Sequence, residues 1–236
     1  MHADDATQPC QVRSKQGMSV GASRVSTQRE RWDQALRERP DRYGTEPSVA
    51  ARASHAPLAA AGTTELLELG GGQGRDTLFF VAAGFEVTVL DFAAAAVETI
   101  AEKAASAGLG AHVRVTQHDV RKPFPYGDEL FDGCYSHMLL CMSLDERELV
   151  RLIGEVGRVL RPGGLCIYTA RTTDDPDCGR GRSLGEGRYE LDGFAVHFFG
   201  PHLIELLAAD FELLDVERFE EGKLQRRLVQ VTMRND

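Results

Sequence analysis

The chain has 236 residues, 42% hydrophobic and 27% charged, a composition typical of a globular protein and unlike that of a collagen, a coiled coil or a wholly disordered chain. Its 27 Lys and Arg against 36 Asp and Glu give a net charge of −9, the wrong sign for binding nucleic acid or an anionic membrane surface. No apolar run reaches the roughly 18 residues of a membrane-spanning helix, and the N-terminus does not resemble a secretory signal. We therefore expect a cytoplasmic protein with no membrane or nucleic-acid partner.

The cysteines and histidines give no sign of a metal site. Five cysteines form an odd set without a C-x-x-C pair, which argues against a disulfide framework and against structural zinc. His197 and His202 flank Gly200-Pro201, which is more typical of a helix start than of a ligand pair. We expect reduced thiols and no metal.

The N-terminal quarter of the chain divides into two parts. Residues 1–28 are polar and show no apolar periodicity, which predicts a disordered tail. Residues 29–63 contain short helical patterns broken by prolines, which predicts a helical cap placed before a sheet. The main domain is then expected over residues 64–236.

After residue 64, short apolar runs alternate with helical patterns, which is typical of βαβ units and a largely parallel sheet. The last two strands are expected to pair as an antiparallel hairpin. The predicted fold class is α/β, a doubly wound Rossmann-like seven-stranded sheet with an antiparallel C-terminal hairpin. The predicted elements are strand 65–69, helix 76–83, strand 86–90, helix 93–107, strands 113–117 and 131–136, helix 145–160, strand 165–170, a Gly-rich loop 174–193, helix 201–209 and strands 212–219 and 228–233.

A glycine-rich turn lies between the first strand and the first helix of this domain. Gly70, Gly72 and Gly74 permit a tight turn and close approach of a ligand to the backbone. The register is G-x-G-x-G rather than the G-x-G-x-x-G of dinucleotide sites, and the acidic Glu68 precedes it. A carboxylate there suits a ligand with an ammonium group better than a pyrophosphate.

Two further acids follow strands of the same sheet. Asp91 ends the second strand, 21 residues after Gly70, where an acid can accept hydrogen bonds from both hydroxyls of a ribose. Phe92 beside it offers a face for an adenine ring, and Asp119 after the third strand can accept from an adenine amino group. The alternative for Asp91 is a helix cap.

From residue 65 onward the chain resembles the class I S-adenosylmethionine-dependent methyltransferases. The segments that carry this resemblance are 68–74, 89–91, 118–120, 131–132 and 159–164. The resemblance implies S-adenosyl-L-methionine as the cofactor. The residues expected to bind it are Glu68, Gly70, Gly72, Gly74, Asp91, Phe92, Asp119, Val120 and Ser136.

A narrower resemblance involves the predicted cap. Residues 31–33 and 43–48 look like the N-terminal cap of small-molecule methyltransferases of the tellurite-resistance and thiopurine type. That resemblance, the negative charge and the lack of an Asn/Asp-Pro-Pro-aromatic signature after the fourth strand predict a small-molecule acceptor rather than a nucleic acid.

Candidates for the acceptor side follow the later strands. His137 after the fourth strand is the predicted catalytic residue, with a buried structural histidine as the alternative. The predicted substrate-binding residues are Arg171, His197 and Arg226. The alternative for Arg171 is a capping or surface arginine, and that for Arg226 is a solvated hairpin end. The loop 174–193 is interpreted as a lid, with disorder as its alternative.

Two other functions are compatible with these motifs. A non-catalytic module that binds S-adenosylmethionine would need every cofactor residue but no acceptor chemistry. A nicotinamide-dependent reductase would share the βαβ start, but it is disfavoured by the glycine register and by the lack of a Tyr-x-x-x-Lys pair.

Overall fold

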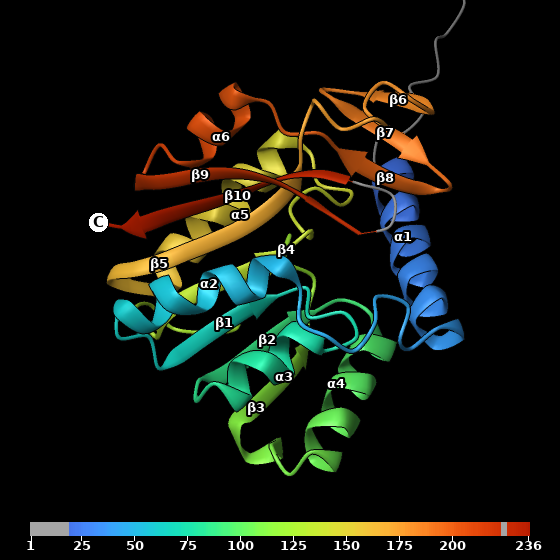
Figure 1. The fold of residues 1–236 in the computed structure, drawn as a ribbon. Helices are drawn as coiled ribbons and strands as arrows, with labels where there is room; N and C mark the ends of the chain where they lie inside the picture. Colours follow the sequence, from blue (N-terminus) through green and yellow to red (C-terminus); the bar gives the residue numbers. More distant parts are fainter. Residues whose placement is uncertain (1–18, 223–225) are drawn as a thin grey trace, which may run out of the picture.

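A computed structural model of the protein describes residues 19–222 and 226–236, with side chains from residue 27 onward. The main sheet has seven strands in the order β3-β2-β1-β4-β5-β10-β9 (Figure 1). The first five are parallel, whereas β10 is antiparallel to both β5 and β9. This confirms the predicted fold class, including the C-terminal hairpin. The strand bounds are β1 Glu65–Leu69, β2 Glu86–Asp91, β3 Val113–Gln117, β4 Phe131–His137, β5 Leu160–Arg171, β9 Phe211–Glu221 and β10 Arg226–Asn235.

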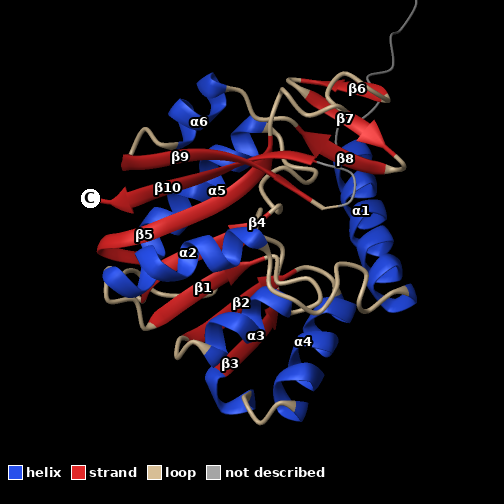
Figure 2. Cartoon of the chain, in the orientation of Figure 1, coloured by secondary structure: helices blue, strands red, loops and turns tan. Residues whose placement is uncertain are grey.

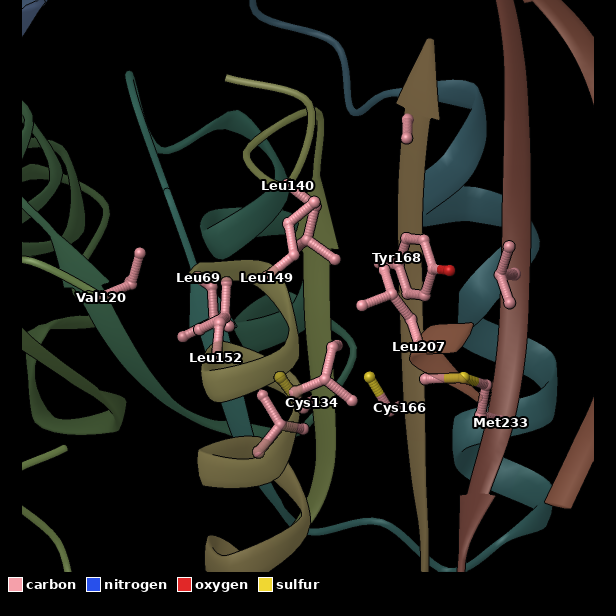
Figure 3. Close-up of a cluster of buried hydrophobic side chains, with 14 of the residues drawn as sticks. Leu69, Val120, Cys134, Leu140, Leu149, Leu152, Cys166, Tyr168, Leu207 and Met233 are labelled. Carbon is pink, nitrogen blue, oxygen red and sulfur yellow. The ribbon is translucent and has the colours of Figure 1, made fainter. Parts of the chain in front are cut away.

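Helices cover both faces of this sheet because its central strands are apolar on both sides. One core cluster joins side chains of α2, α3 and α4 to one face, and another joins α5 and α6 to the opposite face. Figure 2 shows the sheet between these helices, and Figure 3 shows the second cluster, where Leu149 and Leu152 of α5 lie near Cys134, Cys166 and Tyr168. The helix bounds are α1 Ser19–Glu38, α2 Val49–Ala60, α3 Arg75–Ala82, α4 Ala94–Ser106, α5 Glu146–Val159 and α6 Pro201–Leu207.

Local sequence accounts for the helix starts. Asp145 and Glu148 form a reciprocal capping box at the start of α5, in which each side chain accepts from the other residue's backbone N–H. Ser48 caps α2 by accepting from the Ala51 N–H. A short 3₁₀ turn, η1 Gly110–His112, leads into β3.

The N-terminal part differs from the prediction. Helix α1 begins at Ser19, so residues 19–28 are helical rather than part of a disordered tail, and the rest of that predicted tail, residues 1–18, lies outside the described residues. The predicted cap also separates into two helices with different roles. Helix α2 packs on α3 and the central strands as one of the sheet-covering helices, whereas α1 contacts α4 and β8 at the end of the sheet.

The prediction of an irregular loop over residues 174–193 is wrong for its second half. Strands β6 Arg182–Gly185, β7 Arg188–Leu191 and β8 Phe194–His197 form a separate three-stranded antiparallel sheet. Its tight turns contain glycines with positive φ, Gly187 (φ 70°) and Gly193 (φ 83°). The high glycine content, which by composition alone indicates a flexible loop, here serves turns between strands.

Two searches of the described residues bear on partners. No described helix combines the length and apolar character needed to cross a bilayer. Within the same residues, no group of three or more His, Cys, Asp and Glu side chains is arranged to hold a metal ion.

Candidate active site

A cavity of about 840 Å³ lies at the carboxyl ends of β1, β2 and β4, and Trp32 and Leu36 of helix α1 also line it. Such ends are where open α/β sheets bind ligands, because the crossover loops diverge there. The cavity has two parts, which differ in the charged residues that line them. We call the part around Glu68, Gly70, Gly72, Asp91 and Asp119 the acidic half, and the part around Arg75, Asp76, His137, Glu221 and Arg226 the hairpin half.

The glycine turn forms the floor of the acidic half. Gly70 and Gly72 line the cavity with φ angles of 77° and 56°, in the left-handed region that favours glycine. A Cβ on Gly70 would lie 2.6 Å from the Leu139 side chain, whereas one on Gly72 would meet nothing within 4 Å. Gly74 does not line the cavity: it is the N-cap of α3, and its missing side chain lets the turn pack against Ile100.

Asp91 lies at the end of β2 and ties the glycine turn to the next loop. Its Oδ2 accepts from the Gly72 N–H at 3.0 Å and its Oδ1 from the Ala93 N–H at 2.9 Å. The side chain is buried, and burial raises the pKa of Asp91 although these backbone donors act in the opposite direction. Each carboxylate oxygen keeps a second lone pair available for a ligand hydroxyl.

Glu68 is buried beneath the turn. Burial raises the pKa of Glu68 to about 8, opposed by the hydroxyl of Thr77, which donates to Oε2. The carboxyl group is therefore mainly neutral at pH 7 until a cation is placed beside it.

Phe92, Asp119 and Val120 also line the acidic half. Asp119 accepts from both Nε and Nη2 of Arg121 at 2.8 Å. Burial acts to raise the pKa of Asp119, but the hydrogen bonds and charge of Arg121 outweigh it and leave that pKa lowered.

A wall of the cavity comes from the connection between α1 and α2, which sequence reasoning did not place. Gln73 of the glycine turn accepts from the Tyr43 N–H at 3.0 Å and donates to the Gly44 carbonyl. Arg75 donates to the Tyr43 carbonyl at 2.9 Å. Ser48 donates from its N–H and its hydroxyl to the buried Asp76 at 2.7 and 2.8 Å. These bonds hold residues 43–48 against the turn.

His137 lies at the end of β4 in the hairpin half. Its Nδ1 is 2.9 Å from the Thr169 hydroxyl, and its Nε2 is 3.5 Å from Arg75 Nη2 and 3.3 Å from Glu221 Oε2. Burial lowers the pKa of His137, with Asp76 and Glu221 acting to raise it and the two arginines acting to lower it. The imidazole is therefore neutral at pH 7 and 16% exposed toward the cavity.

Arg226 also lines the cavity, but Arg171, Ser136 and His197, like Gly74, do not. Arg171 pairs with Asp175 at 2.5 Å and Asp177 at 2.7 Å and stacks over Phe198, so its charge is already neutralised in the interior.

Ser136 and His197 have structural partners instead of a place on the cavity. The buried Ser136 hydroxyl donates to the Leu69 carbonyl at 3.1 Å and joins β4 to β1. His197 Nδ1 lies 3.1 Å from the Leu144 carbonyl and joins the small sheet to the segment after β4. The predicted roles of Arg171, Ser136 and His197 in ligand binding are therefore corrected to roles in packing.

Several cavity residues were missed. Glu221 and Trp32 were not among the predicted site residues, although both line the cavity together with Met138 and Met142. No local motif marks Glu221, because it reaches His137 only through the pairing of the last two strands.

Comparisons with known proteins were made against this geometry. Residues 66–164 match the family model of a methyltransferase domain. A search of curated protein sequences gives no significant match.

Solved structures align over most of the chain. The 1,6-didemethyltoxoflavin-N1-methyltransferase of Burkholderia thailandensis is 23% identical with a TM-score of 0.71, covering 97% of this chain and 99% of its own. The N-methyltransferase NodS of Bradyrhizobium japonicum is 18% identical with a TM-score of 0.64, covering 86% and 98%. A methyltransferase of Methanosarcina mazei is 21% identical with a TM-score of 0.64, covering 72% and 92%. At these identities the likeness is one of fold.

The fold is thus that of the class I methyltransferases, with its cavity at the expected edge of the sheet. The methyltransferase domain matched over residues 66–164 and the methyltransferase structures that share this fold support a class I S-adenosylmethionine-dependent methyltransferase. The match favours the methyltransferase over the nicotinamide-dependent reductase. The narrower resemblance to the tellurite-resistance and thiopurine groups is not confirmed.

Proposed function

We propose that the acidic half binds S-adenosylmethionine and that the hairpin half binds a small-molecule acceptor, to which the methyl group is transferred directly. The observation that carries this proposal is the Asp91 carboxylate, buried at the end of β2 and bonded to the Gly72 N–H at 3.0 Å. In this position Asp91 lies between the glycine turn, which would bind the amino acid part of the ligand, and the place where the ribose would bind.

The charges of the acidic half fit this ligand. Glu68 and Asp91 are buried, and Asp119 is partly exposed beside Arg121. The cofactor carries a sulfonium and an ammonium, and a cation next to buried carboxyls favours their ionised forms. Glu68 and the turn at Gly70 would hold the amino acid part. Phe92, Asp119 and Val120 would hold the adenine.

Methyl transfer from a sulfonium is an in-line displacement, so the protein must hold the acceptor close to the methyl carbon and exclude water. His137, neutral and open to the cavity, is placed to take a proton from an N–H or O–H acceptor. A small acceptor is supported by the size of the cavity and by the Burkholderia structure, which holds 1,6-didemethyltoxoflavin and S-adenosylhomocysteine.

Calorimetry with S-adenosylmethionine and with NADH and NADPH tests the cofactor assignment. We expect binding of the sulfonium alone, weakened by about 1 to 3 kcal/mol, or about 5- to 150-fold, in Asp91→Ala, because a ribose hydroxyl would lose its buried partner. Asp210→Ala, on the exposed surface, is the control.

Two outcomes would contradict the proposal. Equal affinity in Asp91→Ala and wild type would remove Asp91 from the site. Tight binding with no methylated product from any acceptor would instead support the non-catalytic module.

A further inference from the structure

The β9–β10 hairpin contains two neighbouring Glu–Arg pairs, and in each pair the Glu of β9 lies opposite the Arg of β10. Glu220 is paired in register with Arg227, and Glu221 with Arg226. In the outer pair, Arg227 Nε lies 3.6 Å from Glu220 Oε1, and both side chains are more than half exposed. In the inner pair both residues line the cavity, and the carboxylate of Glu221 lies within ion-pair distance of Arg75 and His137 instead of Arg226. Cross-strand partners of opposite charge normally pair with each other, so the inner pair departs from the expected arrangement.

Each member of the inner pair has a buried polar atom without a hydrogen-bond partner. These atoms are Oε2 of Glu221 and Nε of Arg226, two of the few such side-chain atoms in the described part of the chain. A buried donor or acceptor that makes no hydrogen bond is energetically costly, so each such group beside a cavity is a candidate for a hydrogen bond with a ligand.

Neighbouring residues hold the Glu221 carboxylate by its other oxygen. Oε1 accepts from the Val49 N–H at 3.3 Å and lies 3.5 Å from Arg75 Nη2. Oε2 lies 3.3 Å from His137 Nε2 but makes no hydrogen bond with it. The free oxygen therefore stands beside the residue proposed to accept the proton.

The charges of the hairpin half cancel. Arg75 and Arg226 are matched by Asp76 and Glu221, and burial lowers the pKa of His137 so that it adds no charge at pH 7. Met138, Met142 and Leu228 supply apolar lining beside them. Burying a charged acceptor here would leave one charge without a partner, which is costly, whereas a neutral acceptor leaves the balance intact.

We infer that Glu221 and Arg226 form a recognition pair for an uncharged acceptor that presents a hydrogen-bond donor beside an acceptor, such as the –NH–C(=O)– edge of a cyclic amide. These two atoms are closed to solvent in the ligand-free structure. Once the two side chains turn toward the cavity, the N–H would donate to Glu221 Oε2 and the carbonyl would accept from Arg226 Nε–H, so that both unpartnered atoms are satisfied. This inference rests on the proposed function, since it assigns the acceptor class of the same cavity.

The two Glu–Arg pairs offer matched variants for a test. Glu221→Leu and Arg226→Met remove the polar atoms of the inner pair, while Glu220→Leu and Arg227→Met make the same changes in the outer pair. Uracil, xanthine and lumazine serve as cyclic-amide probes, and catechol and benzoate serve as ligands without that edge. Dissociation constants are measured by equilibrium dialysis with and without S-adenosylhomocysteine, and products are read by mass spectrometry after adding S-adenosylmethionine.

We expect at least one cyclic amide to bind more tightly than catechol and benzoate, and to lose tenfold or more in affinity in each inner variant but not in the outer ones. S-adenosylhomocysteine should bind all five proteins within about threefold, which also shows that they are folded. Should Glu221→Leu fail to fold, Glu221→Met replaces it, with Glu220→Met as its control.

Preference for catechol or benzoate would overturn the inference, as would inner variants that bind the amides like wild type or failure of every cyclic amide to bind. Failure of the proposed function would give a different result from failure of this inference. In that case S-adenosylmethionine and S-adenosylhomocysteine do not bind, while the dialysis without cofactor still compares the two pairs.

Discussion

The acidic half and the hairpin half of the cavity are built in different ways. Every acid of the acidic half lies at or just after a strand end of the parallel sheet, within residues 68–119, and a backbone-to-carboxylate hydrogen bond joins Gly72 to Asp91. The hairpin half brings together α3, the end of β4 and the C-terminal hairpin, which are separated by up to 151 residues between Arg75 and Arg226. A local motif can specify the first half, whereas only tertiary packing creates the second.

This contrast predicts that changes in the hairpin half alter turnover and leave cofactor affinity intact. The largest effect is expected from His137→Asn, which removes the proposed base: kcat on the preferred cyclic amide should fall about 100-fold or more. The affinity for S-adenosylmethionine, measured by calorimetry, should change by less than about threefold.

The pH profile of the wild type gives an independent reading of His137. Because burial lowers the pKa of His137 and its neutral form takes the proton, kcat should be constant near pH 7 and fall only below the usual histidine pKa of 6.5. The charged groups around it are Asp76, Glu221, Arg75 and Arg226. A His137→Asn enzyme with wild-type kcat would end the assignment of this residue.

The second largest effect belongs to the acidic half. Gly70→Ala places a Cβ 2.6 Å from Leu139 at a φ of 77°, so the turn must shift, and we expect cofactor affinity to fall about 10- to 100-fold. Gly84→Ala is the matched control, since Gly84 also has positive φ, 100°, but a Cβ there meets nothing within 4 Å. Similar losses of cofactor affinity in both variants would attribute the effect to general destabilisation.

The sequence predicted the acidic half almost completely, for a physical reason. In the βαβ units of a parallel sheet, a residue's distance from the strand end sets its position at the ligand edge, so Glu68, Gly70, Asp91 and Asp119 could be placed without coordinates. The exception, Gly74, has the positive φ expected of the turn but uses it to pack α3.

The hairpin half could be predicted only in part. His137 and Arg226 are correctly placed on the cavity, but Arg171 and His197 have the same residue types and the same relation to strand ends, and they are engaged by internal partners. Composition does not reveal that Asp175 lies 2.5 Å from Arg171. Glu221 depends on hairpin register, which is set by pairing across the whole strand.

Glu68 is expected to have a smaller effect, on the pH dependence of stability and of cofactor binding. Burial raises the pKa of Glu68 to about 8, so the folded protein without ligand holds a proton there that the unfolded chain releases above about pH 4.5. The stability associated with that proton is complete below pH 4.5 and is lost as pH rises through about 8.

Glu68→Gln should therefore remove part of the fall in the free energy of unfolding between pH 5 and 8, of the order of 1 to 3 kcal/mol, measured by urea unfolding. Cofactor binding at pH 7 should release protons from the wild type but fewer from Glu68→Gln, as read by calorimetry in buffers of different ionisation enthalpy. Equal proton release by both proteins would show that Glu68 does not face the ammonium group.

The smallest effect is expected at Trp32, which lines the cavity from helix α1. Trp32 of α1 lines the cavity and packs against Phe194 of the small sheet with ring centroids 4.8 Å apart. An aromatic pair contributes about 0.5 to 1.5 kcal/mol beyond its buried area, so Trp32→Ala should weaken ligand binding about two- to tenfold. Because α1 contacts both α4 and β8, we expect the dissociation constants for S-adenosylmethionine and for the cyclic amide to rise together. A change in only one of them would assign α1 to that half alone.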